Sequence, residues 1–188
     1  MLKVLISSAA SDRLSAAAQF LSRFSNSAEI LVIGATRAAA DDFVRHFARL
    51  QHATFGINRF SLVQLAARIS ALRLAAKGQV PCSALGMEAT VVRAVDNAHG
   101  NGSLHYFSPV ALLPGFAKAV RTTASELRAA GIAAVNLEHL PPPAPDVSSL
   151  LAAIEGQLVA AHLIDPAALM RTAASTAGAS QSPAGPKT

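Results

Sequence analysis

The sequence contains, in its second apolar run, the stretch Glu29-Ile-Leu-Val-Ile-Gly-Ala-Thr-Arg37. Four consecutive apolar residues followed by Gly34 are typical of a buried strand that ends in a turn. Thr36 is a good N-cap, and the apolar residues behind it recur at helical spacing, at Phe43, Phe47 and Leu50. A strand followed at once by a helix, which we expect to end near Gln51, indicates an α/β protein.

The residues before this stretch show the same pattern. Leu2 to Ser7 is a short run rich in Val, Ile and Leu, which predicts a buried strand. Ser11 is the expected N-cap of a helix that runs to about Phe24, and residues 25–28 form the turn before the next strand. Two strand–helix pairs in succession predict a parallel sheet with right-handed crossovers.

The residues after it repeat the pattern once more. Residues 53–60 are expected to form a third strand. Ser61 and Gln64 have the spacing of a capping box, which predicts the start of a helix that runs to about Lys77. The expected apolar stripe of this helix consists of Leu62, Leu65, Ile69 and Leu72.

Beyond residue 80 the alternation of strands and helices stops. Helices are predicted at 84–98, 115–130 and 147–161. A last helix is expected to begin at Asp165-Pro166, because Asp is a good N-cap and Pro is tolerated at the first helical position. The end of the chain, from Ala177, is small, polar and rich in Pro and Gly, which predicts disorder.

The expected fold class is therefore α/β: a short parallel sheet with flanking helices, followed by an all-helical insertion. We expect the α/β domain start at residues 1–80 and the helical subdomain at residues 81–175. Residues 176–188 form the expected disordered tail.

Composition narrows the class of protein. Hydrophobic residues make up 52% of the 188 residues and charged ones 14%, which argues against disorder over most of the chain. A membrane span needs about 20 apolar residues, and every such window here is interrupted by a charge or a proline. Asp12 and Arg13 also come too early in the sequence for the apolar core of a signal peptide. We therefore expect a soluble, cytoplasmic protein that does not associate with a membrane. Cys82 is the only cysteine, which excludes an internal disulfide and a cysteine-based zinc site.

The charge is unevenly distributed. Residues 1–130 hold 14 Lys and Arg against 7 Asp and Glu, whereas residues 131–188 hold 2 against 4. A basic, Arg-rich first part suits a polyanion such as nucleic acid, and it is also compatible with an ordinary solvated surface.

Ligands of an open parallel sheet bind beyond the carboxyl ends of its strands, which here are three loops. The first is Ser7-Ser8-Ala9-Ala10-Ser11-Asp12-Arg13. A phosphate loop needs glycines, a lysine and a Ser or Thr for Mg²⁺, and this loop has neither glycine nor lysine and carries an Asp where the anion would lie. We expect an ordinary helix start there, and no ATP binding of the usual kind.

The other two loops combine a helix start with an arginine. Thr36 and Arg37 offer a hydroxyl, free amides and a guanidinium, which could hold a phosphate or simply form a capped helix with an exposed arginine. Arg59, Phe60 and Ser61 repeat this combination, and the Phe60 ring could stack on a base or enter the core. These five residues are the candidate DNA-binding residues.

No catalytic site is recognisable from the sequence. The histidines make no pair with the spacing of metal ligands, and Asp41-Asp42 lies within a helix, where neighbouring carboxylates diverge by about 100°. Nucleophile elbows, dinucleotide fingerprints and zinc-protease motifs are absent from the sequence. We expect no catalytic residue, no metal and no cofactor.

The order of these segments resembles the N-terminal region of superfamily 1 helicases of the UvrD/PcrA type, and more closely that of AddB-type helicase-nuclease subunits of the PD-(D/E)XK nuclease family. Residues 30–45 are similar to the strand, Thr-x-x-Ala-Ala and helix of helicase motif Ia, and residues 54–65 to motif Ib. Residues 150–174, with Leu163-Ile-Asp-Pro-Ala-Ala-Leu-Met-Arg-Thr-Ala173, are similar to the segment that ends the helical 1B insertion.

The resemblance implies a P-loop NTPase-like 1A start with a degenerate Walker A loop, as in RecC. It implies a part in DNA double-strand break repair and recombination, with single-stranded DNA and a helicase or nuclease subunit as partners. Thr36, Arg37, Phe60 and Ser61 fall where family members contact DNA, as phosphate and stacking contacts. Helicase and nuclease signatures are both absent from the chain, so no catalysis is implied for it alone.

Two other functions remain open on the sequence. A Rossmann-like small-nucleotide binder would use the turn from Ser7 to Arg13. A structural adaptor would pack its helical insertion, residues 84–161, on a partner. A DNA-engaging module is the first hypothesis, and it predicts salt-sensitive, sequence-tolerant binding of single strands.

Overall fold

The computed structural model describes residues 3–25, 27–50 and 55–179. The chain divides into two compact units, Met1–Leu65 and Ala66–Thr188. The division lies earlier in the sequence than the boundary expected at residue 80, because α3 (Leu62–Ala76) packs from Ala66 onward within the second unit.

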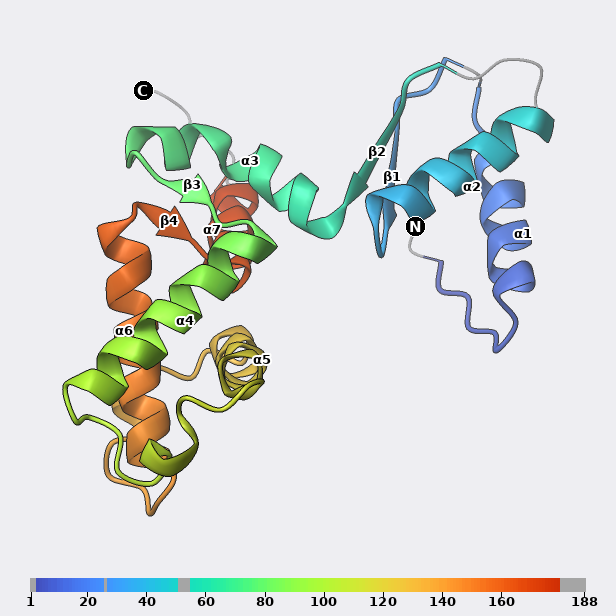
Figure 1. Ribbon diagram of the computed structural model, residues 1–188. Helices are drawn as coiled ribbons and strands as arrows, with labels where there is room; N and C mark the ends of the chain where they lie inside the picture. The colour runs from blue at the N-terminus through green and yellow to red at the C-terminus, as the bar shows by residue number, and fades with distance from the viewer. Residues whose placement is uncertain (1–2, 26, 51–54, 180–188) are drawn as a thin grey trace. The chain divides into compact units, whose positions relative to one another are not determined.

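A parallel pair of strands forms the centre of the first unit. β1 (Ile30–Gly34) and β2 (Ile57–Ser61) pair in the register Ile30↔Ile57 to Gly34↔Ser61. The helix between them, α2 (Arg37–Leu50), runs alongside both strands (Figure 1) and buries Ala40, Val44 and Phe47. The chain is thus α/β with a short parallel sheet, as expected, and the sheet has two strands in the described residues.

Two glycines allow the tight turns of this unit. A Cβ at Gly34 would lie 2.8 Å from the backbone N of Ala40 and from the carbonyl O of Thr36. Gly56 has φ +74°, and a Cβ there would lie 2.9 Å from the carbonyl O of Ala28. A side chain at either position therefore needs a shift of the backbone.

The strand predicted at Leu2 to Ser7 is wrong. Residues 3–7 adopt no strand, and Val4 and Ile6 are 75% and 90% exposed; Leu2 lies outside the described residues. A strand needs hydrogen bonds to a neighbour, and among the described residues β1 pairs with β2 alone. The apolar run shows a preference for burial but carries no information on whether a partner strand is present.

The helix after this segment is α1 (Ala10–Leu21), close to the prediction. Its N-cap is Ala9, without a side-chain hydrogen bond, so the capping role expected for Ser11 is wrong. The reason is that the helix begins two residues earlier than predicted and takes Ser11 into its first turn. The first two residues of the third strand expected at 53–60 lie outside the described residues, and the strand observed there, β2, begins at Ile57.

Helices dominate the second unit. Its elements after α3 are β3 (Val80–Pro81), α4 (Ala84–Gly100), α5 (Phe116–Ala129), α6 (Ala144–Ala160), β4 (Leu163–Ile164) and α7 (Pro166–Ala179), with 3-10 turns at Ser108–Val110 and Ala134–Asn136. The predicted helices are confirmed, including the cap of α7, where Asp165 Oδ1 accepts the amide of Ala168 at 2.7 Å. The unit is not all-helical, because β3 and β4 form a short parallel pair. Two-residue strands are too short for a sequence pattern to reveal.

The core of the second unit lies between α4, α5 and α6. Val91 and Ile154 are fully buried at its centre. Asp146, 3% exposed, accepts the amides of His105 and Phe107 at 2.9 Å each and so holds the connection after α4 against α6. A second cluster joins α3 to α7 through Leu74, Leu169 and their neighbours.

The apolar stripe predicted for α3 is also wrong. Leu72 is 87% exposed and Leu62 56%, whereas the buried positions are Ala66, Ser70 and Leu74. Ala66 and Leu74 are buried because their side chains pack with Leu169 and Ala173 of α7, a contact between segments far apart in the sequence that leaves no local pattern. Of the expected tail, residues 176–179 belong to α7, and the rest lies outside the described residues.

Candidate functional site

The carboxyl ends of β1 and β2 bring the candidate residues together. Because the strands are parallel and in register, Gly34 lies opposite Ser61 and Val32 opposite Arg59. The helices that follow, α2 and α3, therefore begin at the same edge of the sheet. Thr36 and Arg37 at the first helix start thus come near Arg59, Phe60 and Ser61 at the second.

Both helix starts are capped by side chains. Thr36 Oγ1 accepts the amide of Ala39 at 3.1 Å. The amide of Ser61 donates to Gln64 Oε1 at 3.0 Å, and the amide of Gln64 donates to Ser61 Oγ at 3.3 Å, which confirms the capping box. Capping orients each helix start, and the earliest amides of each helix still have no intrahelical acceptor. The positive ends of two helix dipoles consequently lie at one edge.

Two arginines share one carboxylate at this edge. Arg37 Nε lies 3.1 Å from both oxygens of Asp41, and Arg37 Nη1 donates to the carbonyl O of Arg59 at 2.7 Å. Arg59 Nε lies 3.6 Å from Asp41 Oδ1. The side chains of Arg37 and Arg59 remain 43% and 40% exposed. With two guanidinium groups and one carboxylate, the cluster keeps one net positive charge.

Arg59 is incompletely satisfied. Its Nε is buried and has no hydrogen-bond partner among the described residues, since the contact with Asp41 is too long for one. The outer nitrogens of a guanidinium can donate to an anion even where Nε is buried. An oxygen ligand at this edge would find donors already arranged.

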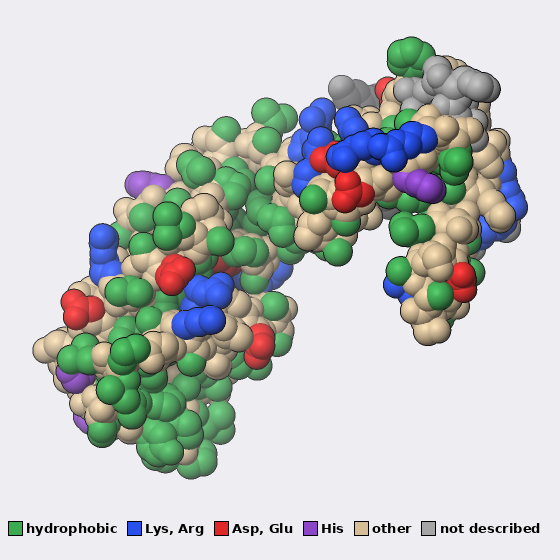
Figure 2. Space-filling view, turned by 45° about the vertical axis from the view of Figure 1, so that its right-hand side comes forward, with side chains coloured by type: hydrophobic (Ala, Val, Ile, Leu, Met, Phe, Trp, Pro, Cys, Tyr) green, Lys and Arg blue, Asp and Glu red, His purple; other side chains and the backbone are tan. Residues whose placement is uncertain are grey.

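Phe60 is half-buried, so it is neither a core residue nor a fully open stacking surface. The guanidinium carbon of Arg37 lies 6.0 Å from the centre of its ring, at the outer limit of a cation–π contact. Lys and Arg side chains gather on the face of the first unit seen in Figure 2, next to acidic ones. The Phe60 ring therefore lies beside the charged cluster formed by Arg37, Arg59 and Asp41.

The first loop forms a closed hydrogen-bonded turn. Ser7 Oγ donates to Asp12 Oδ2 at 3.1 Å and accepts the amide of Ala9 at the same distance, and the Arg13 guanidinium donates to the Ser7 carbonyl. Ser11 Oγ lies 3.4 Å from Asp12 Oδ1. The Asp12 carboxylate thus occupies the position beside the helix start where a phosphate would have to bind. Ser8 and Ala10 bring no positive charge to it.

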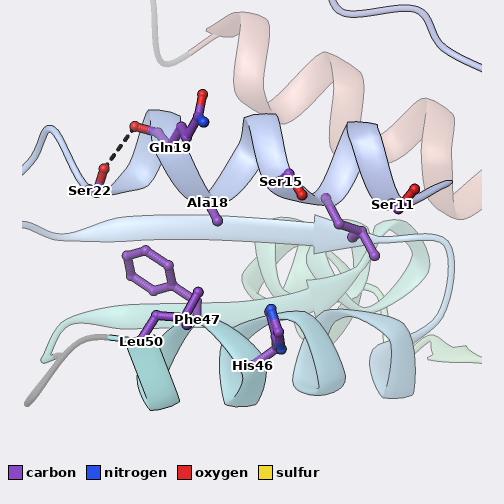
Figure 3. A pocket seen from close by; sticks show the side chains of 9 residues that line it. Ser11, Ser15, Ala18, Gln19, Ser22, His46, Phe47 and Leu50 are labelled. Carbon is purple, nitrogen blue, oxygen red and sulfur yellow. Dashed lines mark hydrogen bonds between the residues drawn. The ribbon is translucent and has the colours of Figure 1, made fainter. Parts of the chain in front are cut away.

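A groove between α1 and α2 was not expected from the sequence. Figure 3 shows Ser11 and Ser15 of α1 on one side of it and His46 of α2 on the other. The groove has a volume of about 510 Å³, and none of the residues that line it is acidic. A serine–histidine pair needs a third group to orient the imidazole, so the groove lacks the makings of a catalytic triad. In the sequence, the spacing of four residues between Ser11 and Ser15 was the signal for this polar face of α1.

Asp165 has a structural role in the second unit, and Cys82 lies near its charge. Asp165 is 3% exposed, bonds to Arg128 and caps α7. Burial, and secondly the charge of Asp165, raise the pKa of the Cys82 thiol, which makes the thiolate scarcer and Cys82 a poor nucleophile. No group of three or more potential metal ligands occurs among the described residues.

Compared with known proteins, the chain matches no family model, no curated protein sequence and no solved structure. Among the described residues, no helix combines the length and the apolar character that crossing a membrane requires. The geometry of the sheet edge is therefore the main guide to function.

Proposed function

We propose that this chain is a non-catalytic module that engages single-stranded DNA, with Arg37 and Arg59 as its phosphate contacts. The observation that supports this most is the register Gly34↔Ser61, which gathers two helix starts and two half-exposed arginines at one sheet edge. Amides at helix starts and guanidinium groups are both favoured partners of phosphate.

The finer proposal follows the family resemblance. The first unit would be a P-loop NTPase-like 1A start with a degenerate Walker A loop, in a cytoplasmic AddB-like subunit of DNA double-strand break repair. Thr36, Phe60 and Ser61 would complete the DNA contact, and a helicase or nuclease subunit would be the protein partner. Two parallel strands with a helix between them agree with such a start, as they do with other α/β folds.

The nucleotide-binding alternative is less well supported. The turn from Ser7 to Arg13 is closed by its own hydrogen bonds, and Asp12 presents negative charge where a phosphate would lie. We therefore expect neither ATP nor NAD to raise the melting temperature of the protein. A clear stabilisation by Mg²⁺-ATP would favour the alternative.

The test is binding of a fluorescent oligothymidylate to the full chain, followed by anisotropy over a range of salt concentrations. The double variant R37A/R59A should bind at least about tenfold more weakly, since each hydrogen bond to a charged group is worth roughly 1.5 kcal/mol and about 1.4 kcal/mol is tenfold in affinity. The slope of log K against log salt should fall by about 0.7 for each lost phosphate contact.

The matched control is K118A/R121A, which removes the same charge from α5 in the second unit. It should leave affinity and slope nearly unchanged. Equal losses in both double variants would mean that binding follows net charge alone, and the sheet edge would then not be the site. Binding that does not respond to salt would also contradict the proposal.

A further inference from the structure

A second groove of the first unit lies between the segment at residues 3–5 and one face of α1, with a volume of about 690 Å³. The groove is lined by the small residues Ala16 and Ala17 and by the larger apolar residues Val4, Leu5 and Phe20. We call it the α1 groove. Phe20 is 41% exposed and Val4 75%, so these apolar side chains are not covered by other parts of the first unit. Small residues in a groove let a partner helix approach closely.

The rim of the α1 groove is positively charged. Lys3, Arg13 and Arg23 line it, and no acidic residue does. Arg13 lies in the first turns of α1, and Arg23 follows just after the end of this helix. None of these three cations forms an ion pair with a carboxylate in the described ranges. The groove therefore suits an apolar ridge with negative charges near its two ends.

The chain itself carries such a ridge, on the exposed side of α4. Leu85 is 76% exposed and Val92 50%, and Glu88 and Asp96 are exposed beside them. The four residues recur at spacings of three and four along one helix face, which we call the α4 ridge. Glu88 and Asp96 are eight positions apart, or roughly 12 Å, and neither has an ion-pair partner in the part of the chain that the structure describes.

We propose that the α4 ridge of one copy of this chain occupies the α1 groove of a second copy. Apolar residues of the ridge would fill the groove, and Glu88 and Asp96 would face Arg13 and Arg23 at its ends, in the helix-in-groove mode of recognition. Each copy has one groove and one ridge, and we expect two copies to exchange this contact in a two-fold dimer. This interface is separate from the sheet edge that we propose for DNA.

The shape and lining of the groove favour a helix over other anionic partners. A stack of bases needs an aromatic surface for successive bases, and Phe20 is the one aromatic residue lining the groove, beside Ala16 and Ala17. A lipid surface is flat, whereas this apolar surface is hollowed.

The experiment is sedimentation equilibrium of the full chain across a dilution series, at low and at high salt. The unaltered chain should form a dimer that weakens as salt is added, because its ion pairs are exposed. The groove variant R13E/R23E and the ridge variant E88R/D96R should each dissociate at least about tenfold more readily, since like charges then face each other. Circular dichroism establishes that both variants keep their helices.

Mixing the two variants gives the sharpest test. The acidic groove of R13E/R23E then meets the basic ridge of E88R/D96R, and its acidic ridge meets a basic groove, so the mixture should recover a dimer. R37A/R59A should dimerise like the unaltered chain, which separates this result from DNA binding. A chain that stays monomeric throughout the series, or a mixture that stays monomeric, would overturn the proposal. The proposal would also be overturned if binding of oligothymidylate or of phosphatidylserine vesicles required Arg13 and Arg23 while dimerisation did not.

Discussion

Asp41 controls how much of the charge at the sheet edge is available to a ligand. Its carboxylate contacts both Arg37 and Arg59, so it holds the two guanidinium groups together and at the same time neutralises one of them. A DNA phosphate would compete with Asp41 for the same donors. The same contact therefore contributes to order and opposes binding.

This competition predicts the effect of Asp41→Asn. Without the carboxylate, oligothymidylate should bind roughly threefold more tightly, since a charge interaction near a protein surface is worth on the order of 0.5–1 kcal/mol. The free energy of unfolding should fall by less than about 1 kcal/mol, because the ion pair is exposed. Both quantities are measured on one preparation, by anisotropy and by urea titration.

Asp42→Asn is the matched control for this residue. It removes the same charge one position along α2, where Asp42 pairs with exposed Arg45 at 3.4 Å. If both variants tighten binding equally, the gain comes from overall charge and not from release of Arg37 and Arg59. Unchanged or weaker binding by Asp41→Asn would argue against DNA phosphates at this edge.

Helix α3 shows how an element can bury a different face from the one its sequence favours. Leu62, Ile69 and Leu72 are exposed, whereas Leu74, 4% exposed, packs in one cluster with residues of α7. A stripe of leucines is the usual signal of a buried face. Here the buried face is set by packing with Leu169 and Ala173 of α7.

Two substitutions in α3 distinguish these faces. Leu74→Ala should lower the free energy of unfolding by about 2–5 kcal/mol, the usual cost of removing a buried leucine side chain. Leu72→Ala makes the same chemical change at an exposed position and should cost less than about 0.5 kcal/mol. Urea titration measures both. A larger loss of unfolding free energy for Leu72→Ala than for Leu74→Ala would instead support burial of the face that the sequence favours.

At the scale of the whole molecule, two compact units predict two unfolding transitions. The first unit depends on the packing of α2 against two strands, and the second has a separate core between α4, α5 and α6. Units with separate cores need not unfold together. Thermal unfolding followed by calorimetry should therefore show two peaks.

Variants assign the two peaks. Thr36→Ala removes the cap of α2 and costs about 1 kcal/mol, which should lower the melting temperature of one transition by roughly 4–8 °C. Thr36→Ser keeps the hydroxyl and should leave it nearly unchanged. Leu74→Ala should shift the other transition. A single peak that moves with both substitutions would show that the units unfold as one.

The sequence by itself determined the local structure of this chain. The strand before Gly34, the cap at Thr36, the capping box at Ser61 and Gln64, and the cap at Asp165 depend on interactions between residues a few positions apart. Such interactions leave a pattern in the sequence. The five candidate residues at the sheet edge were found in the same way, from the loops that follow two strands.

Only the tertiary structure decided which segments have partners. Residues 3–6 form no strand, α3 buries a different face from the predicted stripe, and Asp41 joins Arg37 to Arg59, a contact that links α2 to β2. Each of these outcomes depends on a neighbour that is distant in the sequence. Hydrophobic and charge patterns show that a residue favours burial or an opposite charge, but the neighbour that provides it is fixed only when the chain packs.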